Sequence, residues 1–188
     1  MSQEELRQRR GRMAKENDEI VNIAEMIVKD GFHTTSTELN AVAEGKSYVA
    51  GNIFETVTAN GFAYLHIKTG SKVAAMSYQI LCDALVYYGV YPNATLTADG
   101  TALTVSGRNL VTVIAPTATA FHTPTVTALG SPFLLRTNAA ASGKAKGGDS
   151  GGDSRTLVIP PNKSIVIAVQ NKASNNALVS IVAEWLEV

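Results

Sequence analysis

The feature that most constrains the fold is a series of short β-branched and aromatic runs separated by turn residues. The runs are SYVAGNIFETV, GFAYLHIKTG, KVAAMSYQILCDALVYYGVY, ALTVSG, LVTVIA, TATAFH, PFLLRTN, TLVIPP, KSIVIAVQN and ALVSIVAEWLEV. Turn-forming pairs such as Asn60-Gly61, Pro92-Asn93 and Asp99-Gly100 lie between them. Short strands at this spacing are typical of antiparallel sandwiches and barrels. The sequence therefore predicts a mainly β protein whose body is an antiparallel, jelly-roll-like β-sandwich.

Two local patterns predict how some of these strands connect. The last two runs are expected to form a closing hairpin with its tip at residues 173–176. The segments that begin at Pro92 and Pro124 resemble each other, since each has a Thr-rich run, a Gly turn and an apolar run. This internal similarity predicts two equivalent hairpins.

The N-terminal segment has a different periodicity, which predicts an amphipathic helix over residues 4–30. Apolar residues recur every seven positions, and Asp30-Gly31 supplies a stop signal. The residues that we assign to an interface with a partner protein or with other copies of the chain are Leu6, Arg7, Arg9, Arg10, Arg12, Met13, Ile20, Ile23 and Ile27. Such a helix packs on its own body, bundles with other copies or lies on a partner; the alternative is a solvated charged face. The expected organisation is a helical arm and linker over 1–45 and a β-sandwich body over 46–188.

Charge is concentrated in that arm. Residues 1–30 carry 13 of the 32 charged side chains, although the whole chain of 188 residues has a formal net charge of zero. This balance gives no global attraction to nucleic acid or to an anionic membrane, so neither partner is expected. A β-rich body with so few charges is expected to have much of its surface covered by other molecules.

The stretch GGDSGGDS contains Gly148-Asp149-Ser150-Gly151-Gly152, the letters that surround the nucleophile of chymotrypsin-like proteases. A serine nucleophile also needs a histidine base and an orienting carboxylate, and His66 and Asp83 are too close in sequence for that fold. The stretch lies in a run of small and polar residues, which predicts a flexible Gly/Ser loop over 139–155. We therefore expect no catalysis.

Other candidate chemistry is weak in this sequence. His33, His66 and His122 do not have metal-ligand spacing, so we expect no metal and no cofactor. The single cysteine, Cys82, is expected to be a small buried apolar residue. Three tyrosines near the end of one apolar run, Tyr87, Tyr88 and Tyr91, are candidates either for a sugar-stacking surface or for packing.

Several short motifs occur in an order that resembles a family of small structural proteins of tailed-bacteriophage virions. They are the His66-to-Gly70 segment, PNATLTADGT from Pro92, the Arg108-Asn109 corner, HTPT from His122, and the closing Glu184-Trp185 strand. The resemblance covers roughly residues 61–188, and residues 1–45 lie outside it.

The resemblance implies a capsid decoration or minor head protein with a β-sandwich body. Its expected function is to decorate or cement the capsid through protein–protein contacts, with the major capsid protein as partner and with the chain itself forming homo-oligomers. The expected location is the capsid surface of the virion, after synthesis in the host cytoplasm. The alternative is a head-fibre or tail-associated module that recognises host carbohydrate.

Overall fold

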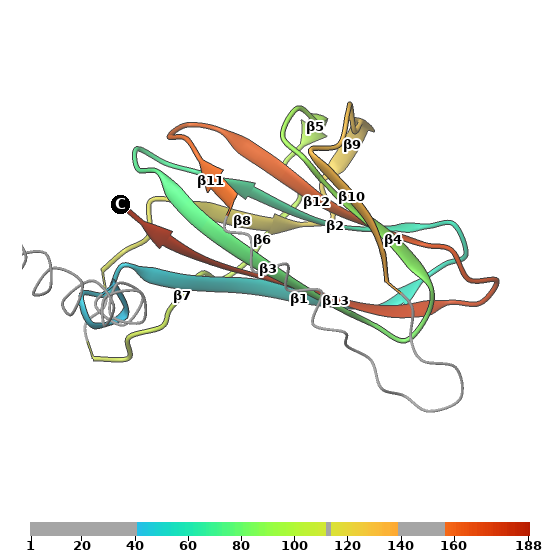
Figure 1. Cartoon of the computed structure of the whole chain (residues 1–188), viewed down its shortest axis with the longest axis horizontal. Coiled ribbons are helices and arrows are strands. Elements are labelled where there is room, and N and C mark those ends of the chain that lie inside the picture. The colour runs from blue at the N-terminus through green and yellow to red at the C-terminus, as the bar shows by residue number, and fades with distance from the viewer. Residues whose placement is uncertain (1–40, 112–113, 139–156) are drawn as a thin grey trace, which may run out of the picture. The chain divides into compact units, whose positions relative to one another are not determined.

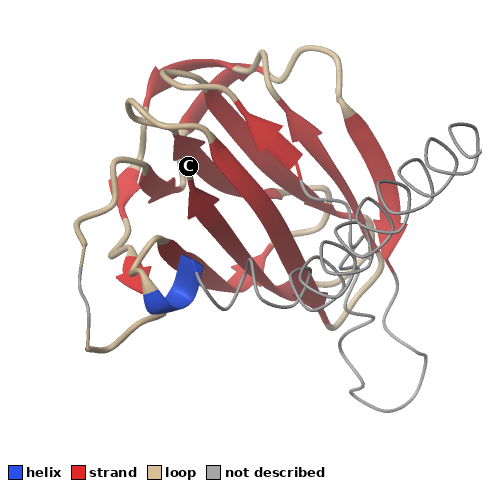
Figure 2. Cartoon of the chain, turned by 60° about the vertical axis from the view of Figure 1, so that its left-hand side comes forward, coloured by secondary structure: helices blue, strands red, loops and turns tan. Residues whose placement is uncertain are grey.

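The computed structural model describes residues 41–111, 114–138 and 157–188. The chain divides into two units, residues 1–40 and 41–188, and only the second is described here. Its strands are β1 (Ser47–Val57), β2 (Phe62–Lys68), β3 (Ala74–Cys82), β4 (Val86–Tyr91), β5 (Thr95–Ala98), β6 (Thr101–Ala102), β7 (Ser106–Gly107), β8 (Thr119–His122), β9 (Thr125–Ala128), β10 (Leu134–Asn138), β11 (Leu157–Ile159), β12 (Ser164–Asn171) and β13 (Ala177–Glu187). The described residues also include one short helical turn, at residues 41–43 (Figure 2).

The strands form two large antiparallel sheets and one small ribbon (Figure 1). The five-stranded sheet has the order β11-β3-β13-β1-β7, and the six-stranded sheet has the order β10-β4-β12-β2-β8-β6. The prediction of a mainly antiparallel β fold is confirmed. The predicted arm helix over residues 4–30 lies outside the described residues.

The order of pairing follows a nested pattern along the chain. Strand β1 pairs with β13, β2 with β12, β3 with β11 and β4 with β10, and successive members of each half alternate between the two sheets. A long antiparallel hairpin that rolls up into two facing sheets has this connectivity, which is the plan of a jelly roll.

The two sheets share one hydrophobic core. Alternate residues of β12, namely Ile165, Ile167 and Val169, join a buried cluster that also contains Trp185 from β13. Across this core the ring of Tyr78 from β3 meets that of Tyr88 from β4 edge to face, with centroids 6.4 Å apart. Each sheet therefore buries one face against the other, as in sandwich packing.

The segment between β4 and β10 is a long insertion that adds strands at the borders of both sheets. Strands β8 and β6 extend the six-stranded sheet beyond β2, and β7 pairs with β1 in the five-stranded sheet. The prediction of two equivalent hairpins here is wrong. The Thr-rich strands of the two similar segments, β5 and β9, pair with each other and form a ribbon that projects from the sheets (Figure 1).

The predicted closing hairpin is also wrong, because β12 and β13 belong to different sheets. The connection between them is organised by the buried side chain of Asn171. Its Nδ2 donates to the carbonyls of Val57 (2.9 Å) and Asn175 (2.7 Å), and its Oδ1 accepts from the Ala173 N–H (2.9 Å). This local network turns the chain from one sheet into the other instead of folding it back on itself.

No helix among the described residues has the length and apolar character needed to cross a membrane.

A buried carboxylate joins the insertion to the last strand. Glu187 is 1% exposed, and its oxygens accept from the N–H groups of Thr117 and Ala118 and from the Thr117 hydroxyl, at 2.9–3.0 Å. Burial, together with the negative charge of Glu187, raises the pKa of Tyr48. The carboxylate thus supplies the hydrogen-bond acceptors that this turn of backbone needs once it is buried.

We predict that Glu187→Ala lowers the free energy of unfolding by about 2–4 kcal/mol, because it leaves several buried donors without an acceptor. Glu184→Ala is the matched control: Glu184 lies on the same strand but is half exposed, and it meets Arg108 at 3.4 Å. It should cost less than about 1 kcal/mol. Urea denaturation of both variants measures the difference, and equal losses would contradict the role given to Glu187.

Candidate functional site

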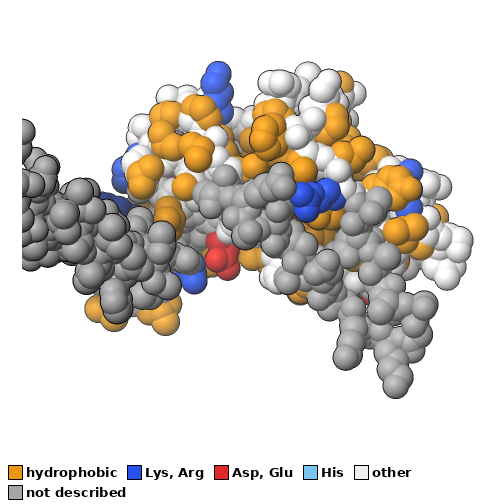
Figure 3. Space-filling view, viewed as in Figure 1, with side chains coloured by type: hydrophobic (Ala, Val, Ile, Leu, Met, Phe, Trp, Pro, Cys, Tyr) orange, Lys and Arg blue, Asp and Glu red, His pale blue; other side chains and the backbone are white. Residues whose placement is uncertain are grey.

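The interface residues predicted from sequence, Leu6 to Ile27 in the segment predicted to be a helical arm, lie outside the described residues. In the described body, the candidate contact surfaces are the outward faces and edges of the sheets. Figure 3 shows hydrophobic side chains in several groups on the face in view, with few charged side chains between them.

The outward face of the five-stranded sheet is poor in charge. The register places Ile53, Val182 and Val158 on the outside, and their strand neighbours on the inside fill the core. Of the paired outward positions in β11, β3, β13 and β1, Glu184 alone carries a charged side chain, and the exposed Glu55 lies on β1 at an unpaired position. Ile53 is 61% exposed and Val158 is 68% exposed. Uncharged positions with exposed aliphatic side chains are typical of the centre of a protein interface.

The outward face of the six-stranded sheet is aromatic. We call the residues Phe62, Tyr64, Tyr87, Tyr91 and Leu135 the aromatic face. The rings of Phe62 and Tyr64 stack with centroids 5.4 Å apart, and Lys172 Nζ lies 5.2 Å from the centre of the Tyr87 ring. The ring of Tyr91 lies over Gly89, where an added Cβ would come within 2.9 Å of it. Burial and the neighbouring Tyr91 raise the pKa of Tyr64.

The three tyrosines proposed from sequence do not form one surface. Tyr87 and Tyr91 point outward, but Tyr88 is 3% exposed and packs in the core against Tyr78. Adjacent residues of a strand face opposite sides of a sheet, so Tyr87 and Tyr88 could not both contribute to one platform. Phe62 and Tyr64 take the place of Tyr88 on the aromatic face.

A cleft of about 320 Å³ lies between β11, the end of β4 and the start of β12. We call it the edge cleft; its lining includes Val90, Pro92, Phe133, Leu157, Val158 and Lys163. The Thr69 hydroxyl fixes one rim, because it donates to the Pro160 carbonyl (2.7 Å) and accepts from the Lys163 N–H (2.9 Å). Phe133, which also lines the cleft, is 69% exposed. The edge cleft is suited to an apolar side chain from another molecule.

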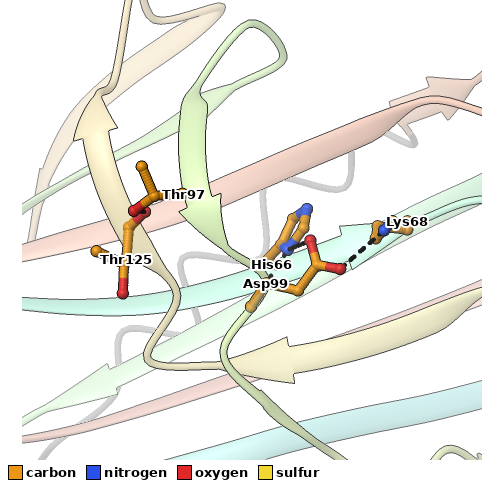
Figure 4. Close-up of polar contacts among 5 residues, drawn as sticks. All are labelled: His66, Lys68, Thr97, Asp99 and Thr125. Atoms are coloured by element: carbon orange, nitrogen blue, oxygen red, sulfur yellow. Dashed lines mark hydrogen bonds and ion pairs between the residues drawn. The ribbon is translucent and has the colours of Figure 1, made fainter.

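A polar cluster beside the six-stranded sheet holds the insertion in place (Figure 4). Lys68 Nζ donates to the Asp99 carboxylate at 2.8 Å, and His66 Nδ1 lies 3.4 Å from the Asp99 carbonyl and 3.6 Å from its carboxylate. The turn that follows requires Gly100, whose φ is +98° and where an added Cβ would lie 2.3 Å from the His122 carbonyl.

The environment of His66 suits a structural role. His66 is 1% exposed, and the centroid of its ring lies 5.7 Å from that of Phe121. Burial lowers the pKa of His66, and this effect outweighs the opposing influence of Asp99. A neutral and covered imidazole anchors a loop well, but it offers little access to a substrate.

The residues weighed for a protease do not meet in the described structure. His66 contacts Asp99, whereas the Asp83 carboxylate accepts from the Leu178 N–H at 2.8 Å. Ser150 and His33 lie outside the described residues.

The other residues considered for chemistry have structural surroundings. His122 contacts the Thr123 hydroxyl at 2.9 Å and the edge of the Phe54 ring. Cys82 is 3% exposed, as expected, and burial raises the pKa of its thiol. Within the described segments, no group of three or more His, Cys, Asp or Glu side chains is placed to hold a metal ion.

Comparison with known proteins assigns the chain to no family. No protein-family profile matches the chain, and no curated protein matches it. Among solved structures, the VP2 subviral particle of infectious bursal disease virus is 12% identical with a TM-score of 0.15, over 77% of this chain and 42% of that chain. A mutant VP2 of the same virus in T=1 particles is 8% identical with a TM-score of 0.13, over 73% and 40%. The chain spans less than half of these VP2 chains, and at these scores they do not establish a shared fold.

We predict that the protein loses stability as the pH falls below about 6.5, the ordinary pKa of histidine. The folded state keeps His66 neutral, so unfolding takes up a proton in this range and becomes more favourable. The pKa of Asp99 is lowered from 3.8, chiefly by its hydrogen bond from Lys68, so its contribution is lost only at lower pH.

The measurement is the thermal unfolding midpoint between pH 7.5 and 5, for the wild type and for His66→Phe. The variant should show a smaller decrease in midpoint than the wild type. Parallel curves for the two proteins would exclude His66 as the group responsible.

Proposed function

We propose that this protein is a structural component of a tailed-phage virion that decorates or cements the capsid through protein–protein contacts and carries out no catalysis. The observation that carries the proposal is the chemistry of the two outward sheet faces. They expose large apolar side chains, and their paired positions contain one carboxylate, Glu184. Such surfaces favour contact with other proteins over contact with water.

Two further observations support this proposal. The motif order over residues 61–188 resembles that of small phage virion proteins, and the nested strand pairing is the jelly-roll plan used by many capsid domains. Lectin domains share that plan, so the fold is consistent both with a capsid protein and with a carbohydrate-binding protein.

The proposed partners are the major capsid protein and further copies of this chain. In this proposal the helix over residues 4–30 binds the capsid and the outward faces of the body contact neighbouring subunits. A regular shell presents the same weak site many times, which increases the total affinity of an oligomer. The proposal needs no cofactor, nucleic acid or membrane, and it places the protein on the capsid surface after synthesis in the host cytoplasm.

The aromatic face supports one alternative, a head-fibre or tail-associated module that binds host carbohydrate. Tyr87 and Tyr91 lie on the same outward face as Phe62 and Tyr64, and aromatic rings of this kind can stack on sugars. Sugar sites also use carboxylates and amides; the paired outward positions of this sheet include the amide of Gln170 but no Asp or Glu. Binding of the purified protein to a glycan array would favour the alternative.

We predict that deletion of residues 1–30 weakens binding to purified capsids that lack this protein by at least about tenfold, or about 1.4 kcal/mol. Cosedimentation of the truncated and the full-length chain with capsids measures the effect. If both chains bind equally tightly, the capsid-binding role of the arm is wrong.

We also predict that Leu135→Lys reduces capsid occupancy several-fold, since a charge on the aromatic face would have to be desolvated in the contact. Leu135 is 59% exposed, so the substitution should leave folding intact. Asn176→Lys, at the exposed connection between β12 and β13, is the control. Equal occupancy for the two lysine variants would remove the aromatic face from the contact.

A further inference from the structure

One apolar segment predicted to be a strand does not lie in one. The described residues of the run LVTVIA, at positions 110, 111, 114 and 115, belong to no strand. Leu110 is 92% exposed and Val111 is 93% exposed. These exposed fractions are higher than those of the other exposed large apolar residues in the described body. We call these two residues the apolar tip. A pair of aliphatic side chains held almost wholly in water is a costly arrangement unless another surface covers it.

Hydrogen bonds hold the backbone that leads into the apolar tip. Before it, Asn109 Nδ2 donates to the Ala43 carbonyl at 2.9 Å, and Asn109 Oδ1 accepts from the Val111 N–H at 2.8 Å. The Arg108 N–H donates to the Ser47 carbonyl at 2.8 Å. After it, Thr117 is held by the buried Glu187 carboxylate. These hydrogen bonds exist in the single chain, before any partner binds.

The apolar tip and the edge cleft lie at opposite borders of the five-stranded sheet. The tip follows β7, at one end of the strand order, and the edge cleft lies beside β11, at the other end. Four strand spacings separate the two borders, or roughly 19 Å. The tip therefore does not fill the cleft of its own chain, but it can fill the cleft of a neighbouring copy.

We propose that copies of this chain associate side by side, with Leu110 and Val111 of one copy inserted into the edge cleft of the next. The occupant is a second copy because one chain carries both an apolar projection and an apolar recess of about 320 Å³, with room for two aliphatic side chains. The formal net charge of zero imposes no overall repulsion between copies. This proposal deepens the proposed function, since it supplies the lateral contact of a decoration array, but its geometry does not depend on a capsid.

The contact joins two different surfaces, so it is head to tail. Such contacts generate a ring when the rotation closes and an open filament when it does not. Two side chains in a cleft bury much less than the roughly 800 Å² per partner of a stable interface. We therefore expect weak association in dilute solution and a marked rise with concentration.

Directed cysteine cross-linking of the full-length protein tests the proposal. Val111→Cys places a thiol on the tip, and Val158→Cys places one at the rim of the cleft, where the native valine is 68% exposed. The native Cys82 is buried. A mixture of the two variants, under mild oxidation, should form disulfide-linked dimers at least about fivefold faster than a mixture of Val111→Cys with the control Asn176→Cys. Val111→Cys alone should also cross-link slowly, because two tips do not meet.

Each other outcome overturns the proposal. Faster cross-linking of Val111→Cys with itself would show a symmetric tip-to-tip contact, and a rate equal to that of the control mixture would show no specific contact. Leu110→Asp gives a second measurement: at high concentration it should reduce the weight-average mass found by sedimentation, and an unchanged mass counts against the contact. Neither assay involves a capsid, so their failure is distinct from a failure to bind particles.

Discussion

The burial of one face of every long strand in a single shared core is the constraint on which the rest of the structure depends. In β12 the residues Ile165, Ile167 and Val169 face inward, and in β13 the buried face includes Ile181 and Trp185. Because side chains alternate along a strand, this arrangement decides which residues remain outside. The residues on the outward faces are therefore those that alternate with the core residues along each strand. Few of them are charged, and this composition requires a functional explanation.

The strand content could be predicted from the sequence, but the connectivity could not. The run SYVAGNIFETV coincides with β1, and most other β-branched runs contain a strand, because β propensity and turn residues act locally. The closing hairpin was wrong because Asn171 forms contacts with Val57, which lies more than one hundred residues away in sequence. The β5–β9 ribbon was missed for the same reason: each Thr-rich strand pairs with its counterpart across the insertion and not with its neighbour.

Less of the candidate site could be predicted. Alternation along GFAYLHIKTG and KVAAMSYQILCDALVYYGVY was sufficient to place Phe62 and Tyr64 on one face and to separate Tyr87 from Tyr88, but only register brings these strands together. The edge cleft combines residues from β4, β11, β12 and the insertion, so no local pattern indicates it.

The buried polar groups hold the connections between strands. Thr69, Asn171 and Glu187 each form hydrogen bonds that fix a connection whose backbone leaves the sheets. These fixed connections hold the apolar surfaces in defined positions. A body with few charges can therefore still form specific contacts.

Electron cryo-microscopy of mature particles tests the central claim most directly, because it shows what covers the outward faces. The account predicts density for this chain on the capsid, with the aromatic face or the outward face of the five-stranded sheet in contact with a neighbouring protein. It is contradicted if the protein is absent from mature particles, or if it is present with both outward sheet faces open to solvent.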